Sequence, residues 1–101
     1  MDQVERITSM EKILDQHREM VDKMEQVLTA FADSQTDYQI FRRYYGSQEY
    51  MKDYDDSRRG LIPAEIKCGI LSEDAAFDLI GDNFHLAIKM PELATDIIKN
   101  H

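Results

Sequence analysis

Between Ile7 and Tyr45, one row of positions recurs at spacings that alternate between three and four residues, and most of them hold an apolar or aromatic side chain. This spacing follows one face of an α-helix, whereas a β-strand would alternate every second residue. No Gly or Pro occurs before Gly46, so no residue in this segment opposes a helix strongly. We therefore predict a long N-terminal helix whose apolar face needs other helices to cover it. The register positions are Ile7, Met10, Leu14, His17, Val21, Met24, Leu28, Phe31, Gln35, Tyr38, Arg42 and Tyr45.

A further apolar row, formed by Ile13, Met20 and Val27, widens this face beyond a two-stranded coiled-coil seam. A helix of about 30 residues is roughly 45 Å long, which exceeds the roughly 35 Å width of a compact globule of this size. Either the remaining helices lie along the first helix or a second copy of the chain covers it. Our leading hypothesis is self-association through the face formed by Ile7, Met10, Leu14, His17, Val21, Met24, Leu28 and Phe31.

Capping signals predict where this helical region breaks. Ser34 and Asp37 have the spacing of a capping box, which marks a helix N-terminus. We therefore expect one helix over about 2–32, a break near Asp33–Gln35 and a second helix over about 35–45. Because the apolar register continues across the break, one unbroken helix is the alternative.

The middle of the chain carries turn signals. Gly46 can supply a left-handed C-cap, and Ser47 can cap a helix that starts near Gln48. Residues 60–72 contain two Gly and one Pro, which predicts a connector with one helical turn after Pro63.

The last third of the chain predicts two more helices. Ser72 is followed by two acidic residues that suit a helix N-terminus, so we expect a helix over about Glu73–Ile80. Residues 81–83 should end it, and a final helix should cover about 83–99. Pro91 lies inside that last helix and should kink or split it.

Length and composition agree with a small helical domain. The chain has 101 residues, of which 43% are hydrophobic and 32% charged, and only four Gly and two Pro occur. So few turn-forming residues argue against a β-rich fold. We predict an all-α fold in a single domain over residues 1–101. It should be a helical bundle of about four to five helices with a long N-terminal helix, which dimerisation can complete.

The charge distribution bounds the kinds of partner. The net charge is −8, with eight acidic and four basic residues in 1–33, five of each in 34–60, and seven acidic and three basic in 61–101. An acidic surface repels phosphate, so we expect neither nucleic-acid nor membrane partners. The N-terminus lacks an apolar signal core, and the single cysteine, Cys68, fits a reducing compartment, so we expect a cytoplasmic protein.

The chain lacks the residue patterns of known catalytic or metal sites. It has no phosphate-binding glycine loop, no nucleophile elbow and no Cys/His zinc spacing. The acidic run after Asp53 fails as a calcium loop, because Arg58 and Ala64 replace the required Gly and Glu. We expect no enzyme activity, no catalytic residues, no cofactor and no metal. A small metal- or ligand-binding bundle that uses Asp82 and His85 is one alternative.

All five tyrosines fall in a short neutral stretch of this otherwise acidic chain, with Arg42, Arg43 and Lys52 between them. Such rings can anchor a protein partner, or they can pack a hairpin between helices. The first interpretation gives an alternative function, an adaptor or inhibitor that binds a protein partner through the 38–54 hairpin. This candidate partner patch comprises Tyr38, Tyr44, Tyr45, Tyr50 and Tyr54.

Three stretches of the chain carry a resemblance to a known family. They are Arg6-Ile7 with Met10-Glu11-Lys12-Ile13-Leu14, Tyr44-Tyr45-Gly46-Ser47 with Asp53-Tyr54, and Gly69-Ile70-Leu71-Ser72-Glu73-Asp74-Ala75 running on to Leu86-Ala87-Ile88-Lys89-Met90. With them, nearly the whole chain resembles a family of short, acidic, helical bacterial proteins classed as domain of unknown function 4298. The resemblance implies a bacterial cytoplasmic protein, and it supplies no catalytic or ligand residues. Pro91 departs from the family's pattern, which continues the helix there.

These observations favour a small, non-enzymatic helical protein that acts through protein–protein interaction, with itself as the first partner to consider.

Overall fold

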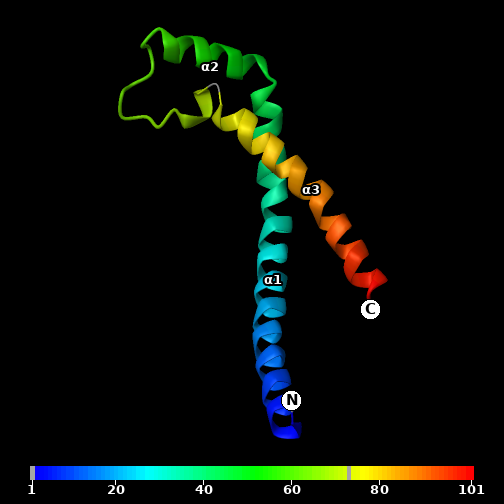
Figure 1. Ribbon diagram of the computed structural model, residues 1–101. Helices are drawn as coiled ribbons and strands as arrows, with labels where there is room; N and C mark the ends of the chain where they lie inside the picture. Colours follow the sequence, from blue (N-terminus) through cyan, green and yellow to red (C-terminus); the bar gives the residue numbers. More distant parts are fainter. Residues whose placement is uncertain (1, 73) are drawn as a thin grey trace. The chain divides into compact units, whose positions relative to one another are not determined.

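The computed structural model describes residues 2–72 and 74–101; most of these residues are helical and none of them forms a strand (Figure 1). The predicted all-α class is confirmed. The described residues form three α-helices and one 3₁₀ turn rather than four to five helices. In chain order the elements are α1 (Gln3–Tyr45), α2 (Gln48–Arg58), the 3₁₀ turn η1 (Gly69–Leu71) and α3 (Ala75–Lys99).

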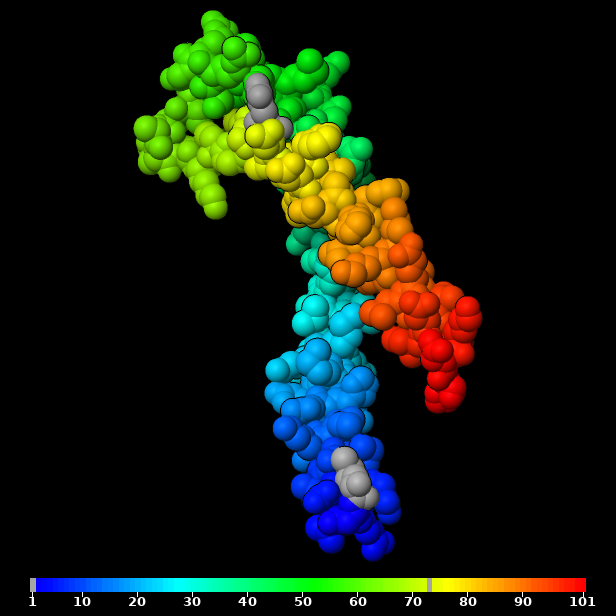
Figure 2. Space-filling view, in the orientation of Figure 1, coloured from blue at the N-terminus to red at the C-terminus, as the bar shows by residue number. Residues whose placement is uncertain are grey.

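The chain divides into two compact units, Met1–Gln39 and Ile40–His101. The first unit is a rod made of most of α1, drawn in blue to green in Figure 2. Asp2 caps this helix, because its Oδ1 accepts a hydrogen bond from the Glu5 N–H at 2.8 Å. Its carbonyl also accepts from the Arg6 N–H at 2.9 Å. The predicted start of the N-terminal helix is therefore confirmed.

The break expected near Asp33–Gln35 is wrong, and α1 runs through it. The Ser34 hydroxyl donates to the Phe31 carbonyl of the same helix at 2.8 Å. A serine can use its hydroxyl in this way inside a helix, and the hydroxyl is then not available to cap a new one. The alternative of one unbroken helix is correct.

In the second unit, Ser47 joins the end of α1 to the start of α2. Its N–H and its hydroxyl both donate to the Tyr44 carbonyl, at 3.0 Å and 2.7 Å. The same hydroxyl oxygen accepts from the Tyr50 N–H at 3.1 Å, which makes Ser47 the N-cap of α2, as predicted. Ser47 satisfies groups at both helix ends, and Gly46 does not adopt the left-handed conformation expected of it.

The left-handed glycine lies instead at the end of α2. Gly60 has φ of 74°. The Gly60 N–H donates to the Ser57 carbonyl at 3.1 Å, and the Leu61 N–H donates to the Asp56 carbonyl at 2.9 Å. These two bonds form a Schellman cap, which needs a left-handed residue at this position.

The connector that follows contains a turn after Pro63, where the Ile66 N–H donates to the Pro63 carbonyl at 3.1 Å. Farther on, the Ser72 hydroxyl accepts from the Ala75 N–H at 3.2 Å at the start of α3. Glu73, where we expected the fourth helix to begin, lies outside the described residues.

The break expected at residues 81–83 is also wrong, because α3 continues through it and through Pro91. A glycine inside a helix costs only about 1 kcal/mol relative to alanine. The apolar side chains on both sides of Gly81 keep a helical spacing, so the two predicted helices form one.

The second unit contains little core. Ala76, at the start of α3, is 1% exposed and is the buried side chain among the described residues. η1 contacts both α2 and α3, so the core of this unit lies around the 3₁₀ turn.

Candidate functional site

The predicted self-association face forms an exposed apolar stripe along the first unit. Ten large apolar side chains of α1 have exposed fractions between 41% for Val21 and 72% for Val4. His17 is exposed as well, and Phe31 is half-buried. We call this surface the α1 stripe. Its exposed apolar members are Val4, Ile7, Met10, Ile13, Leu14, Met20, Val21, Met24, Val27 and Leu28.

Charged side chains are distributed unequally around α1 between Gln3 and Asp33. The rows of helical positions on either side of the central row from Ile7 to Phe31 hold four charged residues, and their net charge is zero. These are Arg6, Glu11, Arg18 and Glu25. The positions farther from the stripe are net acidic, with five acids and two bases. These are Glu5, Lys12, Asp15, Glu19, Asp22, Lys23 and Asp33.

Two ion pairs lie on this helix. Arg18 pairs with Asp22 at 2.9 Å, and Lys23 pairs with Glu19 at 3.1 Å. All four side chains are well exposed, so each pair adds little to stability. The α1 stripe is therefore apolar along its centre and electrically neutral at its edges.

In the second unit, four of the predicted tyrosines come together around Tyr50. The Tyr50 ring meets Tyr44 edge to face, with ring centres 5.5 Å apart. It also meets Tyr45 at 5.0 Å and stacks on Tyr54 at 6.3 Å. The Arg58 guanidinium lies over the Tyr54 ring, 5.7 Å from its centre. All four rings are half-buried, and we call them the tyrosine cluster.

One short hydrogen bond connects the tyrosine cluster to α2. The Tyr44 hydroxyl donates to Asp53 Oδ2 at 2.6 Å. The pKa of Tyr44 is raised to about 12, mainly by burial and also by the hydrogen bond to Asp53 and the negative charge of Asp53. Burial also raises the pKa of Tyr50, and its neighbours Tyr45 and Tyr54 add to the effect. Both hydroxyls therefore stay protonated at neutral pH.

The geometry gives the tyrosine cluster a structural role in holding α2 against the end of α1. The rings pack on one another, as the hairpin interpretation predicts. Tyr38, the remaining member of the predicted patch, belongs to the first unit, so we do not count it in the cluster. Whether these rings also bind a partner stays a prediction.

The residues considered for metal binding do not form a site in the described part of the chain. No group of three or more His, Cys, Asp or Glu side chains comes together there in a way that could hold a metal ion. Asp82 and His85 are both exposed on α3. The Cys68 thiol is half-buried and donates to the Ile66 carbonyl at 3.4 Å.

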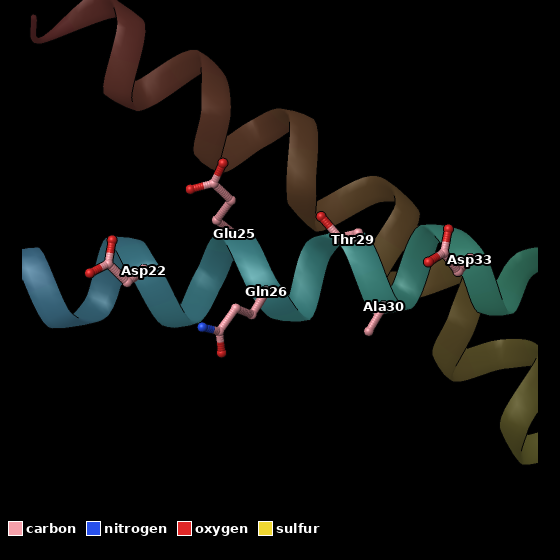
Figure 3. A pocket seen from close by; sticks show the side chains of 6 residues that line it. All are labelled: Asp22, Glu25, Gln26, Thr29, Ala30 and Asp33. Carbon is pink, nitrogen blue, oxygen red and sulfur yellow. The ribbon is translucent and has the colours of Figure 1, made fainter.

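A shallow hollow on α1 is lined by acidic and small side chains, but they do not converge on one point. Figure 3 shows Glu25 and Gln26 pointing to opposite sides of the helix. Asp22 is already paired with Arg18. The hollow has no set of groups that could hold one ligand. Its lining residues are Asp22, Glu25, Gln26, Thr29, Ala30 and Asp33.

An apolar groove in the second unit was missed by sequence reasoning. It has a volume of about 450 Å³ and lies beside the buried Ala76. Its walls come from the end of α1, from η1 with the residues before it, and from the start of α3, so no single periodic pattern marks it. The small pair Ala75–Ala76 was its only local sign. The groove is lined by Phe41, Lys67, Gly69, Ile70, Ala75, Ala76 and Leu79.

Within the helices built from the described residues, none is long and apolar enough to cross a membrane.

Comparison with known protein families gives one match, and it covers residues 7–93. The matched family is described as Domain of unknown function (DUF4298). The chain belongs to this family. Searches of curated proteins and of solved structures gave no match. The resemblance stated from the sequence is therefore confirmed, and the matched residues include the α1 stripe from Ile7 onward and the tyrosine cluster.

Proposed function

We propose that this protein is a non-enzymatic interaction protein that associates with a second copy of itself through the α1 stripe. The observation that carries the proposal is the exposure of ten large apolar side chains on one face of one helix. Contiguous exposed apolar patches mark interaction surfaces in soluble proteins. Each square ångström of apolar surface removed from water contributes about 25 cal/mol, so a stripe of this length can drive association.

Shielding by helices of the same chain was the other explanation that the sequence left open. Leu14, Val21 and Leu28 keep about half of their surface in solvent within the single chain. Among the described residues the first unit contains no element besides α1, so nothing within that unit covers the stripe, and we propose that a second chain does.

The neutral edges of the stripe favour a copy of the same chain over a basic partner. The chain carries a net charge of −8, so two copies repel each other at most orientations. Contact through the α1 stripe brings together flanks whose net charge is zero, and the acidic positions stay on the outer faces. A basic partner would instead fit an acidic rim.

The same proposal includes a cytoplasmic location in a bacterium and excludes nucleic acid and membrane surfaces as partners. The excess of acidic residues supports the exclusion of nucleic acid and membrane surfaces, because their phosphate groups are also negatively charged.

Light scattering coupled to size exclusion tests the proposal. We expect a mass that is a multiple of the 11.8 kDa chain at micromolar concentration. Leu14→Glu and Val21→Glu should each shift the mass to that of one chain, because they place a charge in the middle of the stripe. Gln26→Glu adds the same charge on the face of the helix opposite the stripe and should leave the mass unchanged. A wild-type protein that runs as a monomer would overturn the proposal.

A further inference from the structure

We propose that the two copies of α1 dock parallel and in register, an inference that rests on the self-association proposed above. The orientation follows from the apolar stripe and its four flanking charges taken together. In coiled-coil packing, the charges beside an apolar seam set the orientation of the helices.

A parallel, in-register pair satisfies both features. Each residue of the central row from Ile7 to Phe31 meets its own copy, so this row is covered along its whole length. In this arrangement a flanking residue meets the flanking residue five positions later on the partner helix. Arg6 then faces the partner's Glu11, and symmetry repeats that pair. Arg18 lies beside the partner's Ile13, where its aliphatic stem can cover apolar surface while the guanidinium stays in water.

An antiparallel pair with full overlap of the stripe brings like charges together. Ile7 then lies opposite the partner's Phe31, and the flanking residues meet their own row in reverse order. Glu11 faces the partner's Glu25, and Arg18 faces the partner's Arg18. Three of the four flanking charges are repelled in this register, and Arg6 faces the uncharged Ser34 of the partner chain.

Shifting one helix of the antiparallel pair by one heptad replaces like-charge contacts with opposite-charge contacts, but it leaves part of the stripe uncovered. A shift toward the N-terminus places Glu11 opposite the partner's Arg18, but Leu28 and Phe31 then extend past the end of the partner's stripe. A shift the other way places Arg18 opposite the partner's Glu25, but Ile7 and Met10 then face positions beyond Phe31. The parallel arrangement alone covers all of the central row and opposes no like charges.

Charge exchange distinguishes these arrangements. Arg6→Glu and Glu11→Arg should each weaken dimerisation about threefold to tenfold, because the affected pair occurs twice in a dimer. The double variant R6E/E11R should restore the wild-type dissociation constant. Lys12→Glu makes the same change of charge as Arg6→Glu away from the stripe and should have little effect. Rescue by E11R/R18E or by R18E/E25R, and not by R6E/E11R, would overturn the parallel arrangement.

Spin labels measure the orientation independently. Lys12 and Gln26 are exposed, lie two heptads apart and occupy the same position around the helix. Each is replaced by Cys in the full chain, with Cys68→Ser in the background, and labelled. In a parallel, in-register pair, the two labelled positions of each single-site sample lie at the same height along the helix axis. In a mixture of the two labelled chains, positions 12 and 26 of the two partners are separated by about 21 Å along the axis. In any antiparallel pair, at least one single-site sample is offset by about 21 Å or more.

The two proposals fail in different ways. A monomeric mass for the unmodified chain overturns self-association and the orientation together. A dimer whose single-site distances are unequal, or longer than the mixed distance, overturns the parallel arrangement and leaves self-association intact. Equal single-site distances, both shorter than the mixed distance, support both proposals.

Discussion

Within the tyrosine cluster, Tyr44 makes a side-chain hydrogen bond to α2. Its hydroxyl donates to Asp53 at 2.6 Å across the turn between α1 and α2. We expect Tyr44→Phe to lower the free energy of unfolding by about 1–2 kcal/mol, because Asp53 loses a charge-assisted bond. Urea denaturation followed by circular dichroism measures the effect. Tyr45→Phe is the matched control, since Tyr45 contacts Tyr50 through its ring.

The stability difference between the wild type and Tyr44→Phe should depend on pH. The pKa of Tyr44 rises from 10.0 to about 12 on folding, so the folded chain holds this proton more tightly than the unfolded chain. The stabilisation is complete below pH 10 and is lost as the pH rises from about 10 toward about 12. Tyr44→Phe should therefore lose less stability than the wild type over this interval. Equal losses in the two proteins would contradict the assignment.

At the scale of the element, Gly60 ends α2 in a conformation that other residues adopt at a cost. Its φ of 74° is left-handed, and a Cβ added there meets nothing within 4 Å, so backbone strain alone opposes a side chain. We expect Gly60→Ala to lower the free energy of unfolding by about 1–2 kcal/mol. Gly46 also has open space but no positive φ, so Gly46→Ala should change stability by less than about 0.5 kcal/mol. Thermal denaturation of both variants decides the point, and equal effects would contradict it.

The two glycines also show what local patterns leave undecided. Gly46 and Gly60 both follow a stretch with helical spacing, and from the sequence we predicted the left-handed cap at Gly46. Ser47 made that cap unnecessary, because one hydroxyl serves the ends of both helices. The false break at Ser34 has the same origin, since a serine that can cap a helix can also bond to its own helix. Helix class and the starts of α1 and α2 were predictable, whereas internal breaks depend on which of two local bonds forms.

At the scale of the whole molecule, the α1 stripe was predictable because it lies on one helix and follows one period. The Tyr44–Asp53 bond and the apolar groove beside Ala76 were not predictable in this way. They join residues whose approach depends on the turn between α1 and α2 and on the connector before α3. A surface that lies on a single helix can be predicted from the periodicity of its sequence, but a contact between elements depends on the fold.

We expect the stability of this sparsely packed chain to depend on protein concentration. Among the described residues Ala76 is the buried side chain, while the stripe stays in solvent in the single chain. If association buries the stripe, mass action adds to the stability of the folded state as the protein concentration rises. We expect a tenfold higher concentration to raise the Tm by about 3–6 °C, measured by circular dichroism at several concentrations. Leu14→Glu should remove this dependence, and Gln26→Glu should retain it. A wild-type Tm that does not change over a hundredfold range of concentration would show that folding and self-association are not coupled.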